Sequence, residues 1–267
     1  MLITFLSDFG TADYYAGAMK GAALAVAPGA QVVDLTHDIP PHDIEAGAFA
    51  LAAAFEAFPR GTVHVAVVDP GVGSERRGLL VEASGHLFVG PDNGLFGHVY
   101  ERADGLRVFR LTDQPHARPP ASATFHGRDV FAPAAGALAR GVKPEDLGEE
   151  IQDFVRLAFA RPERRPDGSL EAAVIHTDRF GNLVTNVTPR DISPDALAAG
   201  RARLVVGPHE VRNFRRFYAD ERGGGGPAEP FAIWGSAGFL EISLNQASAA
   251  RALGARRGQK ITVTVKT

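Results

Sequence analysis

Two acidic residues follow predicted strands in the first half of the chain. Asp8 comes just after the apolar run Leu2 to Leu6, and Asp69 comes directly after the run Val63 to Val68. A carboxylate at the first position can accept both hydroxyls of a ribose, or it can cap a helix. Pro70 ends the second strand, and the glycines beyond it allow a ligand to approach the backbone. We therefore expect the second acid at the mouth of a site.

Basic and imidazole side chains accompany these acids. Arg76 and Arg77 precede the next predicted strand, where an Arg near an Asp forms either a structural ion pair or part of a site. His126, followed by Gly127, stands just before a predicted helix, a position that favours a functional role. The segment Thr36 to Asp43 holds two His and two Asp but lacks a helical His pair. A turn with helix caps is therefore favoured there over a metal site.

A short loop in the second half combines three side chains that suit a nucleoside-like ligand. In Asp178-Arg179-Phe180-Gly181-Asn182, the carboxylate can bind an ammonium, the ring can stack and the amide can pair with adenine edges. The same segment also suits an ordinary hairpin turn. The segment Trp234 to Gly238 leaves the same two interpretations open.

The elements that must position the first group of residues alternate along the chain. The predicted strands and helices are Leu2 to Leu6, Tyr14 to Ala27, Gln31 to Leu35, a helix capped by Asp43 and running through Ala57, and Val63 to Val68. Further β-rich runs and one helix are predicted at Leu79 to Glu82, Leu87 to Val89, Leu106 to Leu111 and Asp129 to Arg140, with Gly141 as the helix stop. This order predicts an α/β domain with a mainly parallel sheet flanked by helices.

The second half is predicted to be a smaller, all-β domain that resembles a barrel. Its predicted strands are Ala172 to His176, Leu183 to Val187, Arg203 to Val206, Phe231 to Trp234, Phe239 to Ser243 and Ile261 to Val265. Gly223 to Gly226 is predicted to be a flexible loop without a phosphate-binding role, because no P-loop Lys follows. The predicted division is an α/β domain at 1–153, a Pro- and Gly-containing linker at 154–169 and a barrel-like domain at 170–267.

Composition narrows the class of protein. A chain of 267 residues, 45% of them apolar, can bury a core without cross-links. The absence of cysteine excludes disulfides and thiolate nucleophiles and favours the cytosol. A formal charge of −3, with scattered cations, gives no footprint for nucleic acid, and no leader or membrane-spanning run is recognisable. We therefore expect a cytoplasmic protein that binds small molecules, with no nucleic acid or membrane partner.

Together these segments resemble the S-adenosylmethionine (SAM) hydroxide adenosyltransferases, which are adenosine-forming SAM hydrolases related to fluorinase and chlorinase. The resemblance covers nearly the whole chain through the ordered motifs Ser7-Asp8-Phe9-Gly10, Thr36-His37, Val68-Asp69-Pro70-Gly71-Val72-Gly73, Gly90-Pro91-Asp92-Asn93-Gly94, Phe125-His126-Gly127-Arg128-Asp129, Asp178-Arg179-Phe180-Gly181-Asn182 and Leu244-Asn245-Gln246. It implies an α/β domain, a β-barrel-like domain and a homotrimer. Each site of that trimer would lie between the first domain of one subunit and the second domain of its neighbour.

The resemblance also implies which residues form the site. It assigns catalysis to Asp69, Arg76 and His126. It assigns the ribose diol to Asp8 and the methionine amino group to Asp178. The other substrate contacts that it implies are Phe9, His42, Gly127, Phe180, Asn182, Trp234, Ser236, Ala237 and Asn245. The halogenating relatives have Tyr in place of the catalytic Asp and lack the Arg–His pair, and fluorinase has a tryptophan at the position of His42, so the contact of that side chain is open.

The expected reaction is hydrolysis of SAM to adenosine and L-methionine by attack of water or hydroxide on the ribose 5′ carbon. SAM is the substrate, and no cofactor or metal is expected. Arg76 would stabilise hydroxide, and either Asp69 or His126 would be the base. The alternatives are a chlorinase-like halogenase, a non-catalytic protein that binds SAM or adenosine, and a metal hydrolase based on the cluster His37 to Asp43.

Overall fold

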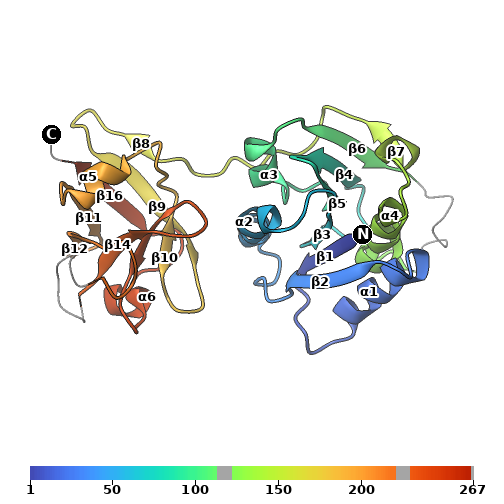
Figure 1. Cartoon of the computed structure of the whole chain (residues 1–267), viewed down its shortest axis with the longest axis horizontal. Helices are drawn as coiled ribbons and strands as arrows, with labels where there is room; N and C mark the ends of the chain where they lie inside the picture. The colour runs from blue at the N-terminus through green and yellow to red at the C-terminus, as the bar shows by residue number, and fades with distance from the viewer. Residues whose placement is uncertain (113–121, 221–228, 266–267) are drawn as a thin grey trace. The chain divides into compact units, whose positions relative to one another are not determined.

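The computed structural model describes residues 1–112, 122–220 and 229–265 (Figure 1). The chain divides into two compact units, unit 1 at residues 1–158 and unit 2 at residues 159–267. The predicted loop Gly223 to Gly226 lies outside the described residues. In the described part of the chain, no helix is long and apolar enough to span a membrane.

Unit 1 is built on a mixed seven-stranded sheet in the order β2-β1-β3-β5-β4-β6-β7. The neighbours β2, β1, β3 and β5 run parallel, whereas β5, β4, β6 and β7 pair antiparallel. The expectation of a mainly parallel sheet therefore holds for only half of it. The strands are β1 (Leu2–Ser7), β2 (Gln31–Thr36), β3 (Val63–Val67), β4 (Gly78–Ala83), β5 (His86–Pro91), β6 (Arg107–Leu111) and β7 (Gly148–Glu150).

A two-residue hairpin accounts for the change of direction. Ala83 of β4 pairs with His86 of β5, so only Ser84 and Gly85 connect the two strands. Both residues have positive φ, 52° and 77°. Positive φ at both turn positions is the type I′ turn, whose twist matches an antiparallel pair. The Ser-Gly dipeptide was the local signal for this hairpin.

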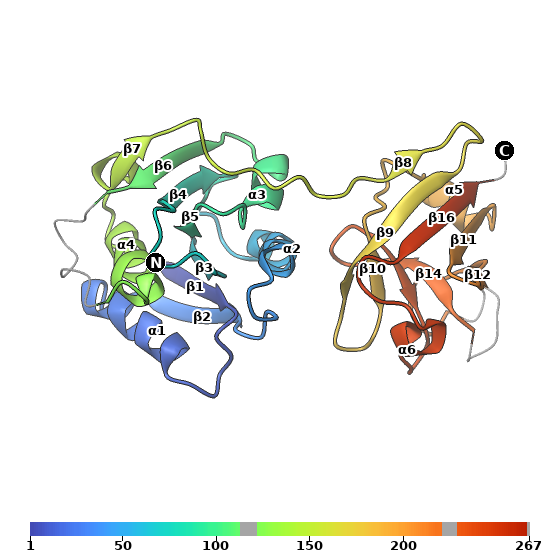
Figure 2. The same cartoon turned by 180° about the vertical axis from the view of Figure 1, so that it is seen from behind.

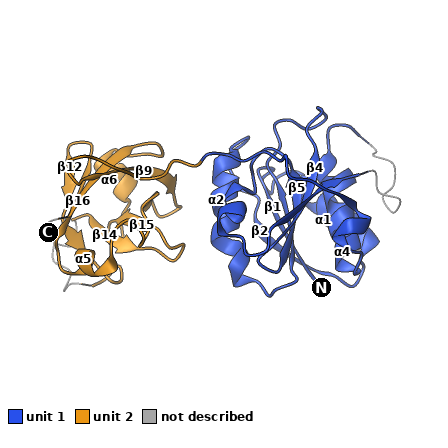
Figure 3. Ribbon diagram, turned by 90° about the horizontal axis from the view of Figure 1, so that it is seen from above, with its two compact units in different colours: residues 1–158 blue, residues 159–267 orange. Residues whose placement is uncertain are grey.

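Helices cover both faces of the unit 1 sheet. α1 (Tyr15–Val26) and α4 (Ala132–Ala139) lie side by side on one face, and α2 (Ile44–Ala54) and α3 (Gly97–Arg102) lie on the other (Figures 2 and 3). Apolar side chains fill the layer between the sheet and the α1–α4 pair, among them Ile3, Phe5, Met19, Val65, Val89 and Phe131. The two helical layers cover the faces of the sheet, and loops follow the carboxyl ends of its parallel strands.

Two helix ends follow the predicted signals. The carboxylate of Asp43 accepts a hydrogen bond from the Ala46 backbone N–H at 3.0 Å, which confirms the predicted cap of α2. That helix continues as a 3₁₀ turn over Phe55–Ala57. The helix predicted from Asp129 begins instead with a π-helical turn at Gly127–Phe131, and Gly141 with φ 91° follows its end.

Unit 2 is a curled, barrel-like sheet around one apolar core. Its order is β12-β11-β16-β9-β10-β15-β14-β13, with β8 added beside β9, and every pair except β13–β14 is antiparallel. The strands are β8 (Glu163–Arg164), β9 (Leu170–Thr177), β10 (Leu183–Thr185), β11 (Ala202–Val206), β12 (His209–Val211), β13 (Asn213–Phe214), β14 (Phe231–Trp234), β15 (Leu240–Ser243) and β16 (Lys260–Val265). The described helices are short, α5 (Pro194–Ala198) and α6 (Ala249–Leu253), as the predicted β-rich pattern requires.

Candidate active site

The first two acids lie at the same edge of the unit 1 sheet. β1 and β3 are parallel neighbours, with Ser7 paired to Val67, so Asp8 and Asp69, one and two residues beyond this pair, both follow the same edge of the sheet. Oδ2 of Asp8 accepts a hydrogen bond from the His42 backbone N–H at 2.9 Å. The contact is made by the backbone amide of His42, whose φ is 67°, and not by its ring.

Asp69 is held by Arg76 in a partly buried ion pair. Nε of Arg76 lies 2.9 Å from Oδ1 and 3.0 Å from Oδ2 of the carboxylate, and Nη2 also donates to Oδ2. The side chains are only 11% and 5% exposed, and the guanidinium lies 5.2 Å from the centre of the Phe131 ring. Multiple charge-assisted bonds fix both the position and the orientation of the carboxylate.

His126 completes this cluster through its Nδ1 atom, which lies 2.8 Å from Nη2 of Arg76. A guanidinium can only donate, so Nδ1 is the acceptor, and the neutral ring carries its proton on Nε2. Burial and, after it, the charge of Arg76 lower the pKa of His126, while the smaller effect of Asp69 opposes them. The imidazole is therefore neutral at pH 7 and presents an N–H donor.

Glycines allow the segment around His126 to pack closely. Gly73 has φ 79°, and a Cβ on it would lie 2.7 Å from the carbonyl oxygen of Ala123. A Cβ on Gly127 would lie 2.8 Å from Sδ of Met19 in α1. The resemblance assigns Gly127 to substrate binding. In the structure, close packing against Met19 also leaves no room for a side chain at this position.

Aromatic rings connect the Asp8 loop to the His126 segment. The ring of Phe9 lies 5.9 Å from that of Phe125 in an edge-on arrangement, and Tyr15 contacts both rings at 5.7 Å and 5.2 Å. Such contacts add to apolar burial and orient the loops. Phe9 therefore connects Asp8, the acid predicted to bind the ribose, with Phe125, the residue before His126.

The His37 to Asp43 segment is engaged in local structure. His37 is 3% exposed, with Nδ1 2.7 Å from Oγ of Ser7 and Nε2 3.1 Å from Oδ1 of Asp34. The Asp43 side chain caps α2. Among the described residues, no group of three potential ligand side chains comes together to hold a metal ion. The side chains of Thr36, His37 and Asp43 are thus engaged in hydrogen bonds with neighbouring residues.

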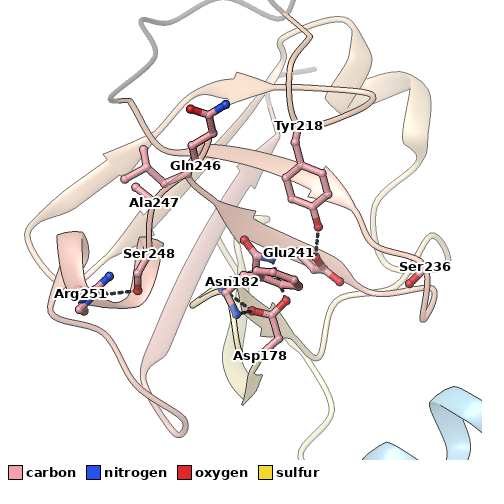
Figure 4. Close-up of a pocket in the computed structure, with 11 residues that line it drawn as sticks. Asp178, Asn182, Tyr218, Ser236, Glu241, Gln246, Ala247, Ser248 and Arg251 are labelled. Carbon is pink, nitrogen blue, oxygen red and sulfur yellow. Dashed lines mark hydrogen bonds between the residues drawn. The ribbon is translucent and has the colours of Figure 1, made fainter.

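Unit 2 carries a pocket of about 640 Å³ (Figure 4). Its lining residues are Asp178, Phe180, Asn182, Tyr218, Ser236, Glu241, Leu244, Gln246, Ala247, Ser248 and Arg251. Four of them were predicted from the sequence: Asp178, Phe180, Asn182 and Ser236. The pocket wall does not include the predicted contacts Trp234, Ala237 and Asn245. The ring of Trp234 packs against the apolar core of the unit instead.

Asp178 organises the loop that it begins. Its Oδ1 accepts from the backbone N–H groups of Phe180 at 2.9 Å and Asn182 at 2.8 Å, and its Oδ2 accepts from Nδ2 of Asn182 at 2.8 Å. Gly181 has φ 85°, and a Cβ on it would collide with Ser248. The Phe180 ring is left 77% exposed, where it is free to stack on a ligand.

Tyr218 and Glu241 are pocket residues that sequence reasoning missed. The Tyr218 hydroxyl donates to Oε2 of Glu241 at 3.4 Å. A Cβ on Gly235 would collide with Oε1 of Glu241. Burial and, after it, the charge of Asp178 raise the pKa of Glu241. Glu241 alternates with apolar residues along its strand, which is the ordinary pattern of a solvent-facing position, so no signal in the sequence marked it.

Comparison with known proteins finds similarity along the chain. Residues 3–148 match the SAM hydroxide adenosyltransferase N-terminal domain, and residues 172–262 match the C-terminal domain of the same family. A Thermus thermophilus protein named (R)-S-adenosyl-L-methionine hydrolase is 41% identical, covering 97% of this chain and 98% of that protein. A fluorinase from an Actinoplanes species is 26% identical, covering 98% and 97%. The crystal structure of an uncharacterized conserved protein from Thermotoga maritima superimposes with a TM-score of 0.88 at 29% identity, covering 98% and 99%.

Proposed function

The chain belongs to the SAM hydroxide adenosyltransferase family, and on that basis we propose that it hydrolyses SAM to adenosine and L-methionine. The observation that carries the proposal is the partly buried, hydrogen-bonded cluster of Asp69, Arg76 and His126. The greater identity to a named SAM hydrolase than to a fluorinase favours water over halide as the nucleophile. Chromatography of SAM incubated with the protein tests this. Adenosine and methionine in equal amounts are expected, and intact SAM or a 5′-halogenated product refutes it.

The cluster suits a single displacement at the ribose 5′ carbon. The oxygen of water forms a bond to this carbon as the carbon–sulfur bond breaks. The electron pair of the carbon–sulfur bond stays on sulfur, which leaves as neutral methionine. Negative oxygen meets a positive sulfonium, so charge disperses in the transition state, and a dry site favours the reaction. Holding the water in line with the carbon–sulfur bond removes much of the entropic barrier.

The hydrogen bonds of the cluster suggest a division of roles. Neutral His126 offers Nε2–H to the water oxygen, and the charge of Arg76 stabilises hydroxide character there. His126 can accept no proton on Nδ1 without losing its bond from Arg76. Asp69 is then the group that receives the proton of the attacking water. In oxygen-18 water, adenosine should carry the label at its 5′ oxygen with inverted configuration at the carbon. Retained configuration contradicts direct attack.

The substrate contacts remain part of this proposal. Asp8, with one carboxylate oxygen engaged by a backbone amide, binds the ribose diol. Asp178 contacts the methionyl amino group, and Phe180 and Asn182 contact adenine. Roles for the other expected contacts are likewise proposed from the family: Phe9, His42, Gly127, Trp234, Ser236, Ala237 and Asn245.

The sulfur configuration of the substrate is a further part of the proposal. The Thermus thermophilus relative is named for (R)-SAM, and we propose the same preference here. Adenosine release from the two separated sulfur epimers of SAM, measured side by side, tests it. Equal rates for both epimers contradict the preference.

We also propose that a homotrimer shares each site between neighbouring subunits, as the family resemblance implies. Asp69 belongs to unit 1 and Asp178 to unit 2. Mixed trimers of Asp69→Ala and Asp178→Ala subunits should then regain activity, because some sites receive both native residues. Persistent inactivity of verified mixed trimers, or full activity of a monomer on dilution, refutes the shared site.

No metal or cofactor is part of the proposed reaction. Exhaustive treatment with a chelator should leave adenosine release unchanged. Loss of activity that a divalent ion restores would revive the metal-hydrolase alternative. Chloride added in excess should likewise give no chlorinated nucleoside.

A further inference from the structure

A chain of side-chain hydrogen bonds links the Asp8 loop to the neighbouring strand of unit 1. Oγ of Ser7, at the end of β1, lies 2.7 Å from Nδ1 of His37. Nε2 of His37 lies 3.1 Å from Oδ1 of Asp34 in β2, and Nζ of Lys20 donates to Oδ2 of the same carboxylate at 2.9 Å. Ser7 and His37 are both buried, so water does not compete for the contact between them.

For a neutral imidazole, the protons of this chain have one consistent arrangement. The carboxylate of Asp34 only accepts, so Nε2 of His37 carries the proton and donates to it. Nδ1 of His37 is then an acceptor, and the Ser7 hydroxyl donates to it. The lone pairs of the Ser7 oxygen therefore remain for the backbone N–H of Phe9, which donates to Oγ at 3.3 Å. His37 thus sets the direction of the hydroxyl that holds the residue after Asp8.

Backbone contacts join the same two segments around Asp8. The N–H of Gly10 donates to the carbonyl oxygen of His37 at 2.8 Å, and the N–H of His42 donates to Oδ2 of Asp8 at 2.9 Å. The pairing of β1 with β2 also shifts register just before this loop. An irregularity of this kind redirects the side chains near it. The direction of Asp8 therefore depends on the segment that contains His37.

We propose that His37 is a positioning residue, which orients Asp8 toward the ribose hydroxyls through the hydroxyl of Ser7. The inference rests on the proposed function, in which Asp8 binds the ribose diol, and it gives His37 a role that this function leaves open. In the described part of the chain, no hydrogen bond reaches Oδ1 of Asp8, so this oxygen can accept from the ligand. His37 itself does not contact the ligand; it acts through Ser7 and Phe9.

Two substitutions of His37 separate its two side-chain hydrogen bonds. In His37→Asn, the amide oxygen takes the place of Nδ1 and can still accept from Ser7. In His37→Gln, the amide N–H takes the place of Nε2 and can still donate to Asp34. Both variants lose the buried ring, so both lose packing. Only His37→Gln loses the contact with Ser7, so only this variant should misplace Asp8.

Adenosine, which has the ribose diol, and 2′,3′-dideoxyadenosine, which lacks it, are the probes. By calorimetry, His37→Gln should bind adenosine about 3- to 10-fold more weakly than the native chain, as expected for one lost hydrogen bond. It should bind dideoxyadenosine within about 2-fold of the native chain, and His37→Asn should bind both nucleosides within about 2-fold. Native affinity of His37→Gln for adenosine overturns the proposal. So do equal losses for both nucleosides, or equal losses in both variants, which show a structural role only.

Ser7→Ala tests the same contact from its other side. It should weaken adenosine as much as His37→Gln does and leave dideoxyadenosine within about 2-fold of native affinity. The double variant Ser7→Ala/His37→Gln should be no weaker than either single variant, because both remove one interaction. Additive losses contradict the proposal.

Two controls separate this inference from its premise. His86→Gln replaces another buried histidine of unit 1, which contacts His64, and it should leave the affinity for adenosine unchanged. Asp8→Ala should weaken adenosine about 10- to 100-fold and dideoxyadenosine far less. Native affinity of Asp8→Ala for adenosine removes this acid from the ribose and refutes the role of His37 with it. Absence of adenosine release by the native chain would refute hydrolysis and leave these affinities interpretable.

Discussion

The two units balance their buried charges differently. In unit 1, Asp69 is paired with Arg76, and Asp92 is paired with Arg77 at 2.7 Å. In the unit 2 pocket, Asp178 and Glu241 form no ion pair with any side chain in the described part of the chain. A balanced cluster holds its geometry before a substrate arrives, whereas an unbalanced pocket attracts a cation. We infer that unit 1 supplies the chemistry and unit 2 the recognition of charge.

The largest effect on kcat is expected from removing a member of the cluster formed by Asp69, Arg76 and His126. Asp69→Ala, Arg76→Ala and His126→Ala should each lower kcat by about 10²- to 10⁴-fold. Affinity for S-adenosylhomocysteine should change far less, because the lost interactions act mainly in the transition state. Rates and affinities measured on the same preparations check this. Losses in affinity as large as those in kcat would place the cluster in binding.

A triple variant sharpens the same test. Since we propose that all three residues act on one water, the triple variant should be little slower than the slowest single variant. Arg110→Ala is a matched control, since this arginine pairs with Glu149 in an exposed position of unit 1. It should keep native kcat.

Asp178→Ala should have the opposite profile. Affinity for S-adenosylhomocysteine should fall about 10- to 100-fold, and kcat at saturation should change little. It should also weaken binding of 5′-methylthioadenosine, because the loop that holds Phe180 and Asn182 loses three hydrogen bonds. Calorimetry with both ligands checks this. Native affinity for both would remove Asp178 from the site.

The fall of kcat at low pH should follow the protonation of His126. Its pKa is lowered by burial and then by Arg76, so the ring stays neutral at pH 6.5. Protonation converts Nδ1 into a donor that faces the donor of Arg76, which breaks the cluster. kcat should therefore hold through pH 6.5 and fall about tenfold per pH unit below the pKa of His126. A decline that begins above pH 6.5 in a pH–rate profile contradicts this.

The stabilities of the two units should respond to acid with opposite signs. Burial and then the charge of His86 lower the pKa of His64 to about 3. Unfolded His binds a proton below about pH 6.5 and native His64 does not, so unit 1 loses up to about 1.4 kcal/mol per pH unit from pH 6.5 toward 3. The raised pKa of Glu241 works the other way: this residue stabilises folded unit 2 when it is protonated, and that contribution is lost as pH rises through its raised pKa.

One tryptophan makes this difference measurable. Trp234 is the single tryptophan of the chain and lies in unit 2, so its fluorescence reports that unit, while circular dichroism reports both. In urea titrations at pH 7 and pH 5, the two midpoints should separate. Glu241→Gln should abolish the shift of the fluorescence midpoint. Parallel shifts of both signals contradict the prediction.

Much of the fold was predictable where the local pattern decides the element. The apolar run of β3, buried at every position, has the sequence of a central parallel strand. The reversal of direction at β4 was not predicted, because it depends on the backbone of two residues, Ser84 and Gly85, whose turn signal is only a dipeptide. Alternation of strands and helices alone could not reveal it.

The candidate site divides in the same way. Arg76 and His126 are 50 residues apart, and only their motifs, through the family resemblance, predicted that they belong together. Tyr218 and Glu241 carry no motif, and they meet because the segment after β13 brings Tyr218 to Glu241 of β15 in one pocket. Alternation assigns such polar positions to solvent, although loops that border the sheet can cover them.

The contact between Gly235 and Glu241 also constrains how this protein can evolve. A side chain at position 235 is compatible with the fold only after the carboxylate has withdrawn or the residue at 241 has become shorter. A mutational path that changes position 241 first avoids this collision, whereas the reverse order requires the Glu241 side chain to move. The two positions form an epistatic pair, and comparison of both single variants with the double variant would reveal this dependence on order.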